Sequence, residues 1–283
     1  MPGTLYLVGT PIGNLGDMTP RAVETLRSVD FIAAEDTRVT AKLLHHFGVA
    51  RPMVSCREQN ERRRAQEIVA RIAAGESCAV VTDAGMPCIS DPGELLVALC
   101  VEQGVDVRVV PAASAAISAL ALSGLATARF SFEGFLTTNR GKRLERLEEV
   151  RPLRSTLIFY EAPHKLRTTL DDLYGTLGDR RCALCRELTK LHEEVVRCTL
   201  SEAVALYRET EPRGEYVLVV EGNREPDAPA DFGAAVDRVR TLAAAGASLS
   251  SAAKAVAAET GLQKGALYKA ALAETGPDDQ ERP

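Results

Sequence analysis

Short apolar runs alternate with longer amphipathic stretches through the first 124 residues. The runs are almost entirely apolar, which is typical of strands buried on both faces of a parallel sheet. Most of the stretches between them end at a glycine, where an α-helix often stops. The pattern predicts repeated strand–helix units around a parallel sheet. The predicted strands are residues 4–11, 30–36, 51–56, 77–83 and 105–111, and the predicted helices are residues 19–28, 39–47, 61–74, 94–103 and 114–123.

The rhythm changes after Gly124, where strand patterns become more frequent and a basic helical stretch intervenes. This composition predicts a second α/β unit with more hairpin character than the first. The predicted strands are residues 129–136, 155–162, 180–188, 194–200 and 214–222, with the third and fourth paired and the last closing the sheet. A helix is also predicted near residues 164–174.

The sequence therefore predicts an α/β protein with two α/β lobes, a cleft between them and a C-terminal helical tail. The expected domains are an N-terminal parallel lobe (1–124), a C-terminal α/β lobe (125–222), a linker (223–233) and the helical tail (234–283). In open α/β sheets, ligands bind beyond the carboxyl ends of the strands. Unusual loops follow four such ends, so we expect them to line one cleft: residues 9–17, 35–38, 83–93 and 111–114.

The loop "DAGMPCISDPG" (83–93) combines prolines, glycines and two carboxylates directly after a buried strand. Gly85 permits close approach of the main chain to a ligand, and Pro87 and Pro92 hold the shape of the loop. The glycine-rich segment 9–17 matches neither the dinucleotide fingerprint nor the P-loop, whose lysine it lacks. We therefore expect a small polar ligand that is neither a dinucleotide nor a nucleoside triphosphate.

The bulk composition places limits on the class of protein. The chain has 283 residues, of which 46% are hydrophobic, and a net charge of -5. No apolar stretch is long enough to span a bilayer and the N-terminus lacks a signal-peptide pattern, so we expect a cytoplasmic protein without membrane contact. The seven scattered cysteines are expected to be reduced and buried. Cys182 and Cys185 form a lone CxxC without a second ligand pair, so no metal is expected.

Basic residues gather locally although the chain is acidic as a whole. The clusters at 62–64 and 139–154 are either solvated helix faces or patches that contact RNA. Residues 248–272 resemble a helix-turn-helix with a turn near Gly261. This segment either packs as a small helical cap or meets phosphates through basic and aromatic side chains. The candidates for phosphate contact are Lys254, Lys264, Tyr268 and Lys269.

Seven strings occur in a fixed order and carry a family resemblance: "LYLVGTPIGNLGDMT", "IAAEDTR", "DAGMPCISDPG", "RFSFEGFL", "TLIFYEAPH", "CRELTKLHEE" and "GEYVLVVEG". With them, the chain resembles the 16S rRNA cytidine 2′-O-methyltransferases, a bacterial branch of the tetrapyrrole methylase superfamily. The resemblance implies a tetrapyrrole methylase-like fold that binds S-adenosylmethionine as methyl donor between its lobes. It implies methyl transfer to the ribose 2′-oxygen of a cytidine in 16S rRNA near the decoding centre. It also implies a homodimer whose partner is 16S rRNA or the 30S subunit.

The positions of the family's motifs imply which residues contact the donor. In the first lobe these are Pro11, Asp83, Ala84, Gly85, Met86, Ile89, Ser90 and Ser114, and in the second lobe Tyr160, Leu188, Gly214 and Glu215. Asp83 either caps backbone amides of its own loop or contacts the ligand, and its place at the cleft favours the contact.

Two positions depart from the family's pattern. Ala112-Ala113 stands where Gly-Pro is usual, which adds a Cβ where main chain is expected near the ligand. Either the backbone there has negative φ and tolerates alanine, or the wall of the pocket is shifted. Met86 stands where threonine is common, so we expect a backbone or apolar contact from this residue.

Methyl transfer to a ribose hydroxyl needs alignment and a base or cation beside a weak nucleophile. We expect Asp36 and Arg38 on the acceptor side, and Glu187 and Lys190 as a pair from the second lobe. Each pair has a simpler explanation, as a helix N-cap with an ion pair or as an exposed salt bridge. Two other functions remain open: a methylase of tetrapyrroles or other small molecules, and a non-catalytic RNA-binding factor.

Overall fold

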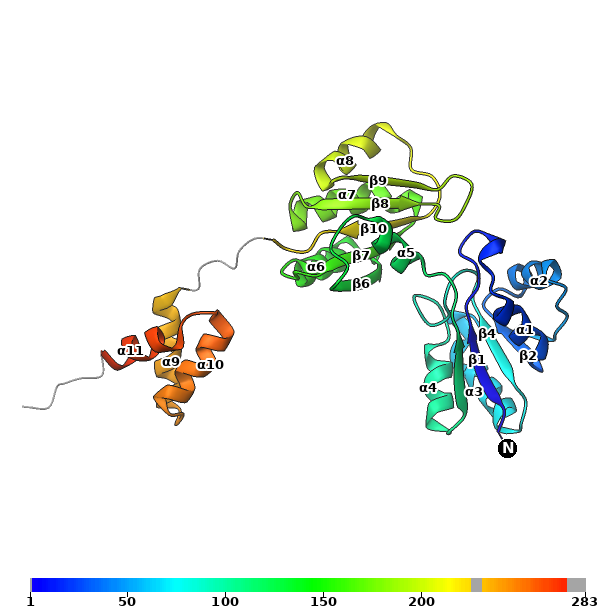
Figure 1. The fold of residues 1–283 in the computed structure, drawn as a ribbon, viewed down its shortest axis with the longest axis horizontal. Coiled ribbons are helices and arrows are strands. Elements are labelled where there is room, and N and C mark those ends of the chain that lie inside the picture. Colours follow the sequence, from blue (N-terminus) through cyan, green and yellow to red (C-terminus); the bar gives the residue numbers. More distant parts are fainter. Residues whose placement is uncertain (1, 225–230, 274–283) are drawn as a thin grey trace, which may run out of the picture. The chain divides into compact units, whose positions relative to one another are not determined.

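The computed structural model describes residues 2–224 and 231–273 of the chain. The chain divides after Asn223 into two compact units, here unit 1 and unit 2 (Figure 1). The predicted linker 223–233 has its centre at residues 225–230, which lie outside the described residues, as do residues 274–283 of the predicted tail. Within the described ranges, no helix is long and apolar enough to cross a membrane.

The first sheet of unit 1 is entirely parallel, with the order β3-β2-β4-β1-β5. Every residue of β2 and β4 is buried, as their continuous apolar runs predicted. The strands are β1 (Thr4–Val8), β2 (Phe31–Ala34), β3 (Met53–Ser55), β4 (Cys78–Val81) and β5 (Asp106–Val110).

Helices cover both faces of this sheet. Alternate residues of β2 enter different clusters, since Phe31 packs with Ile68 and Leu96 while Ile32 packs with Leu26 and Leu44. The covering elements are α1 (Pro20–Ser28) and α2 (Thr37–His46) on one face, and α3 (Glu61–Ala73) and α4 (Glu94–Glu102) on the other. Two short 3-10 turns, η1 (Leu15–Asp17) and η2 (Glu58–Asn60), lie in the connections. The predicted helices are confirmed, with bounds within two residues of those expected.

The second sheet is mixed, with the order β6-β7-β10-β8-β9. β6 and β7 are parallel, whereas β10 runs antiparallel to both of its neighbours. The prediction that the last strand closes the sheet was wrong, because β10 is the central strand and all five of its residues are buried. The strands are β6 (Phe130–Phe135), β7 (Thr156–Glu161), β8 (Arg181–Arg186), β9 (Glu194–Thr199) and β10 (Tyr216–Val220).

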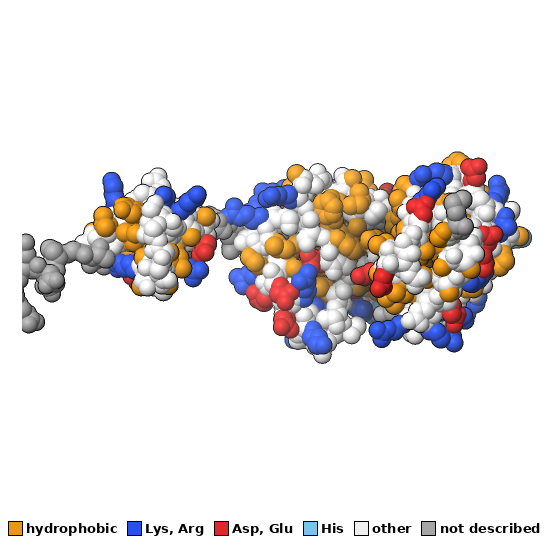
Figure 2. Space-filling model, turned by 90° about the horizontal axis from the view of Figure 1, so that it is seen from below, with side chains coloured by type: hydrophobic (Ala, Val, Ile, Leu, Met, Phe, Trp, Pro, Cys, Tyr) orange, Lys and Arg blue, Asp and Glu red, His pale blue; other side chains and the backbone are white. Residues whose placement is uncertain are grey.

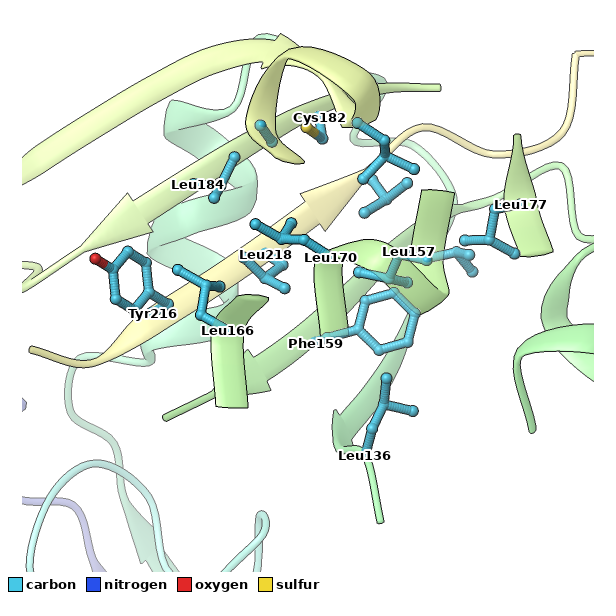
Figure 3. Packing of buried hydrophobic residues seen from close by; sticks show 14 of the residues in the cluster. Leu136, Leu157, Phe159, Leu166, Leu170, Leu177, Cys182, Leu184, Tyr216 and Leu218 are labelled. Atoms are coloured by element: carbon cyan, nitrogen blue, oxygen red, sulfur yellow. The ribbon is translucent and has the colours of Figure 1, made fainter. Parts of the chain in front are cut away.

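Three helices, α6 (Arg140–Val150), α7 (Pro163–Leu177) and α8 (Leu200–Glu209), pack on one face of this sheet. Figure 3 shows the core that they bury, including Leu157 and Leu218 from the strands and Leu166 from α7. α8 was not predicted from the sequence, although Thr199 and Glu202 form a capping box at its start. The opposite face of the sheet is covered by α5 (Ala115–Leu122), which follows the first sheet in the chain.

The CxxC residues are separated by this arrangement. Cys182 belongs to the core under α6–α8, and Cys185 belongs to the core under α5. Two positions three apart on a strand point to opposite faces, so the two thiols do not face one site. All seven cysteines are free thiols, as predicted.

The basic stretch 139–154 is α6 with its flanks, and its arginines are largely paired within the protein. Asp172 of α7 is almost fully buried and forms ion pairs with both Arg140 and Arg143. Arg146 pairs with Glu133 and with Glu149. On the face shown in Figure 2, some Lys and Arg side chains lie beside Asp and Glu, and others lie apart from them. These pairs favour the interpretation of this cluster as a helix face over its interpretation as a patch that contacts RNA.

Unit 2 is a bundle of α9 (Phe232–Ala244), α10 (Leu249–Thr260) and α11 (Lys264–Ala273) around small apolar side chains. Ser248 caps α10 by accepting the N–H of Ser251. Gly261 ends α10 in the left-handed conformation, which turns the chain into α11. This is the helix–turn–helix arrangement that the sequence predicted. Lys254, Lys264 and Lys269 are exposed, whereas Tyr268 packs partly against the core.

Candidate functional site

Unit 1 holds a cavity of about 350 Å³, here the main cleft, which is lined by loops of both sheets. This volume lies within the range of small-molecule and cofactor sites. The loops after β1, β2, β4 and β5 contribute to it, as the rule for open α/β sheets predicted. Ten of the residues expected to contact a donor line it: Asp83, Ala84, Gly85, Met86, Ile89, Ser90, Ser114, Tyr160, Leu188 and Glu215.

The loop after β4 is anchored to the loop after β1. Thr10 and Gly85 exchange two backbone hydrogen bonds, of 2.8 and 3.1 Å. Cys88 and Ser90 both adopt positive φ, which is uncommon for residues other than glycine. Such conformations persist where the surrounding structure holds them, and they concentrate at ligand sites. The proline- and glycine-rich composition therefore fixes a strained backbone at the rim of the cleft.

The two departures from the family's pattern contact each other. Ala112 donates its N–H to Sδ of Met86 at 3.4 Å. A Cβ added to Gly9 would lie 2.5 Å from Cβ of Ala112 and 2.6 Å from Sδ of Met86, so glycine is required there. Neither Ala112 nor Ala113 has positive φ. The backbone therefore tolerates alanine there, which was one of the two alternatives drawn from the sequence.

Three carboxylates, here the acidic cluster (Glu35, Asp83 and Asp91), lie together in the main cleft. Burial, reinforced by Glu35 and Asp83, raises the pKa of Asp91 to about 7. Burial also raises the pKa of Glu35, although the backbone N–H of Asp83 opposes this by donating to Glu35 Oε2 at 3.2 Å. No member of the cluster forms an ion pair with a described residue. The cluster is therefore suited to a cationic ligand.

The second sheet contributes a closed charge network, here the Lys190 network (Glu187, Lys190 and Glu215). Lys190 Nζ lies 2.9 Å from Glu187 Oε1 and 2.8 Å from Glu215 Oε2. Glu187 Oε1 also accepts the N–H of Glu215 at 3.0 Å. Burial pushes the pKa of Glu187 upward, but the backbone N–H of Glu215 and the Lys190 ammonium together hold that pKa below its ordinary value.

A family model described as Tetrapyrrole (Corrin/Porphyrin) Methylases matches residues 4–204, which include the whole first sheet and every strand of the second sheet except β10. The chain belongs to the tetrapyrrole methylase family. A second model, described as RsmI C-terminal HTH domain, matches residues 230–275.

The relatives of this tetrapyrrole methylase include proteins named ribosomal RNA small subunit methyltransferase I. The one from Synechocystis sp. is 49% identical over 95% of this chain and 98% of its own length. The one from Escherichia coli O157:H7 is 44% identical over 97% of this chain and 96% of its own length. Among solved structures, a diphthine synthase superposes with a TM-score of 0.60 at 15% identity, over 78% of this chain and 90% of its own. That likeness shows the fold alone.

Asp36 and Arg38 do not line the main cleft of this tetrapyrrole methylase. Asp36 caps α2 by accepting the N–H of Arg38 at 2.8 Å, and its Oδ2 lies 2.6 Å from Arg38 Nη2. Hydrogen bonds from the Arg38 side chain and backbone hold the pKa of Asp36 far below its usual range. The geometry is that of a helix N-cap with an ion pair, which the sequence analysis gave as the simpler explanation.

Pro11 and Gly214 also lie outside the lining of the main cleft. Pro11 faces a smaller neighbouring pocket, and Ile12 takes the place beside the cleft. Gly214 has φ +75°, and a Cβ there would lie 2.6 Å from atoms of the Glu187 side chain. Gly214 therefore makes room for the Lys190 network, which is a structural reason for the glycine.

The sequence analysis missed several residues of this cleft. Asp91 was not among the predicted donor contacts, yet it lines the cleft and its carboxylate has no hydrogen-bond partner among the described residues. Phe135 stacks edge-on with Tyr160 at 5.4 Å between ring centroids, although it is 56% exposed. An aromatic residue near the carboxyl end of the predicted strand 129–136 was the available signal. The other missed lining residues are Ile12, Ala115, Glu161, Ala162, Cys185, Tyr216 and Val217, whereas Glu35 belongs to the loop 35–38 that was predicted to line the cleft.

Proposed function

We propose that this chain is an S-adenosylmethionine-dependent methyltransferase that methylates the ribose 2′-hydroxyl of a cytidine in 16S rRNA near the decoding centre. The observation that carries the proposal is the extent of the match to relatives named for the small-subunit rRNA. At 49% identity over 95% of the chain, the match spans both sides of the main cleft and unit 2. The cytidine and its 2′-oxygen rest on the resemblance of the loop motifs.

The residues of the main cleft fit S-adenosylmethionine. The donor supplies a methyl group on a cationic sulfonium and also carries an ammonium. The acidic cluster complements both cations, because unpaired carboxylates in a partly buried site attract positive charge strongly. Tyr160, Phe135 and Leu188 offer an apolar wall suited to a heterocyclic base. We assign the donor to this cleft on these grounds.

The reaction also needs a group that accepts the hydroxyl proton as the oxygen gains its methyl. Asp91 suits a general base near neutral pH, because its pKa of about 7 lets its carboxylate form at that pH and take a proton readily. Asp36 is a weaker candidate, because Arg38 stabilises its carboxylate form. Arg38, whose side chain is exposed, is a candidate for holding RNA phosphates beside the cleft, whereas Lys190 is paired with Glu187 and Glu215 and holds its loop in place.

The proposal includes a homodimer and contact with 16S rRNA or the 30S subunit. Val109 on edge strand β5 and Phe130 on edge strand β6 are exposed apolar side chains that a second copy would cover. In unit 2, Lys254, Lys264 and Lys269 would meet phosphates and dock the substrate. Light scattering of the purified protein tests the dimer, with a monomer mass as the contrary result.

The decisive experiment is methyl transfer from radiolabelled S-adenosylmethionine to 30S subunits purified from cells that lack the gene. The RNA is then digested to nucleosides and analysed by mass spectrometry. Label in 2′-O-methylcytidine is the expected result. Label in another nucleoside would correct the acceptor. An unlabelled RNA, with donor binding intact by calorimetry, would overturn the rRNA proposal in favour of a small-molecule acceptor on the same fold.

A further inference from the structure

A second pocket of about 260 Å³ lies on the other side of the loop after β1. Pro11 and Leu15 of that loop form one side, and Val39 and Leu43 of α2 are the apolar residues of the other. Leu15 is 44% exposed and Val39 is 40% exposed, so this pocket leaves large apolar side chains open to water. Facing apolar side chains of this kind accept a flat heterocyclic ring.

Two polar side chains of this pocket, Thr82 and Lys42, lack a hydrogen-bond or ion-pair partner among the described residues. Thr82 lines it, and the buried hydroxyl oxygen of Thr82 has no hydrogen-bond partner within the described ranges. Buried hydroxyls normally have a partner, so the polar edge of a ligand would supply what the protein does not. Lys42 is exposed beside the apolar walls and forms no ion pair with any described residue. A cation in that place suits a phosphate of the same nucleotide, which is bonded to the ribose that carries the ring.

A third cavity, of about 490 Å³, also adjoins the main cleft. Its lining is acidic, in contrast to the pocket beside Lys42. Arg57 is its one cationic lining residue within the described part of the chain, against six carboxylates: Glu35, Asp36, Glu61, Asp83, Asp91 and Glu94. A polyanion is repelled from such a surface. Of the two cavities beside the main cleft, electrostatics therefore favour the pocket with Lys42 for binding RNA.

Asp83 is the residue that joins the two sites. It lines the main cleft and also the pocket beside Lys42, and no other described residue is common to both. We propose that this pocket binds a nucleobase of the acceptor RNA strand, which places the attached ribose near Asp83 and the donor. The inference rests on the proposed function. The same ring chemistry is found in the donor's adenine, so the test must separate the two sources.

The test fills the pocket with a bulky side chain and compares it with a matched control. Val39→Trp occupies the pocket, whereas Ala41→Trp adds the same ring to an exposed position of the same helix that does not line it. We expect Val39→Trp to raise the KM for 30S subunits about tenfold, with the dissociation constant of S-adenosylmethionine unchanged within about twofold. Ala41→Trp should leave both constants within about twofold, which excludes a general effect of tryptophan on α2.

Other results overturn the inference. If Val39→Trp weakens S-adenosylmethionine binding and leaves the KM for 30S subunits unchanged, the pocket holds the donor's adenine. If neither constant changes, the pocket is not a binding site. Wild-type protein that binds S-adenosylmethionine but labels no RNA is a distinct outcome, in which the proposed function fails and takes this inference with it.

A second measurement examines Lys42 independently of the catalytic assay. The probe is a short single-stranded oligoribonucleotide whose affinity is measured over a range of salt concentrations. For Lys42→Gln we expect the slope of log affinity against log salt to fall by about 0.7, the effect of one lost phosphate contact. A slope equal to that of wild type removes Lys42 from the site and overturns the phosphate contact.

Discussion

The two sides of the main cleft differ in whether their charged side chains form ion pairs within the protein. On the side of the first sheet, the acidic cluster places three carboxylates together without a described ion pair. On the side of the second sheet, the Lys190 network encloses its ammonium between Glu187 and Glu215. A charge that the protein satisfies itself holds a loop in place, whereas one that it leaves unsatisfied is kept for a ligand. The acidic cluster is therefore the binding element, and the Lys190 network is its support.

The largest effect should come from removing charge from the acidic cluster. With Asp83→Asn and Asp91→Asn combined, we expect the dissociation constant of S-adenosylmethionine to rise about a hundredfold, roughly tenfold for each lost charge. Isothermal titration calorimetry measures this. Glu148→Gln, on the exposed surface of α6, is the control and should leave the affinity unchanged. Unaltered donor affinity in the double variant would show that the cluster does not hold the donor cation.

The Lys190 network should respond in stability rather than in affinity. Glu187→Gln removes the more buried partner of Lys190, so we expect a loss of about 1–2 kcal/mol in the free energy of unfolding. Glu215→Gln should cost less than about 0.5 kcal/mol, because the Glu215 side chain is 80% exposed. Urea denaturation of both variants measures the difference. Equal losses would contradict the view that burial decides which glutamate matters.

Asp91 should make both binding and stability depend on pH. Its folded pKa, about 7, lies above the ordinary value of 3.8, so its charged form is disfavoured in the folded protein. The contribution of protonated Asp91 to the free energy of unfolding is fully present below the ordinary pKa and is lost as pH rises through about 7. Asp91→Asn should therefore raise stability above that pH by on the order of 1 kcal/mol, allowing for solvent screening. Thermal denaturation of both proteins across this range measures it.

The same carboxylate predicts the opposite trend for donor affinity. Only its charged form attracts a cation, so wild-type affinity for S-adenosylmethionine should increase by roughly fivefold from about pH 6 to about pH 8, given about tenfold for the full charge. Asp91→Asn should lose this increase. A pH profile shared by wild type and variant would assign the titration to another group.

The smallest effect is expected at Arg38. Arg38→Ala breaks its ion pair with Asp36, but neither residue lines the main cleft. We expect the dissociation constant of S-adenosylmethionine to change by less than about twofold, since an exposed ion pair contributes little. A larger change would mean that the loop after β2 reaches the donor.

Much of the fold was predictable because its signals are local. Buried parallel strands appear as apolar runs, and glycines such as Gly48 and Gly75 mark the helix ends. Sheet topology predicted that the loops after parallel strands meet at one edge, whereas the ten predicted donor contacts that line the cleft came from the family resemblance.

What tertiary structure decided concerns partners distant in the chain. Nothing local in "YVLVV" tells a central strand from a closing one, and β10 became central by pairing with both β7 and β8. Asp91 showed no distinctive signal until folding placed it beside Glu35 and Asp83, since a pKa depends on neighbours in space. Glu187 and Glu215 likewise met at Lys190 only in the folded chain. The sequence by itself determined the elements and the rim on which the site lies. Long-range packing determined which charges meet there, because burial and electrostatic interaction depend on distance in space rather than along the chain.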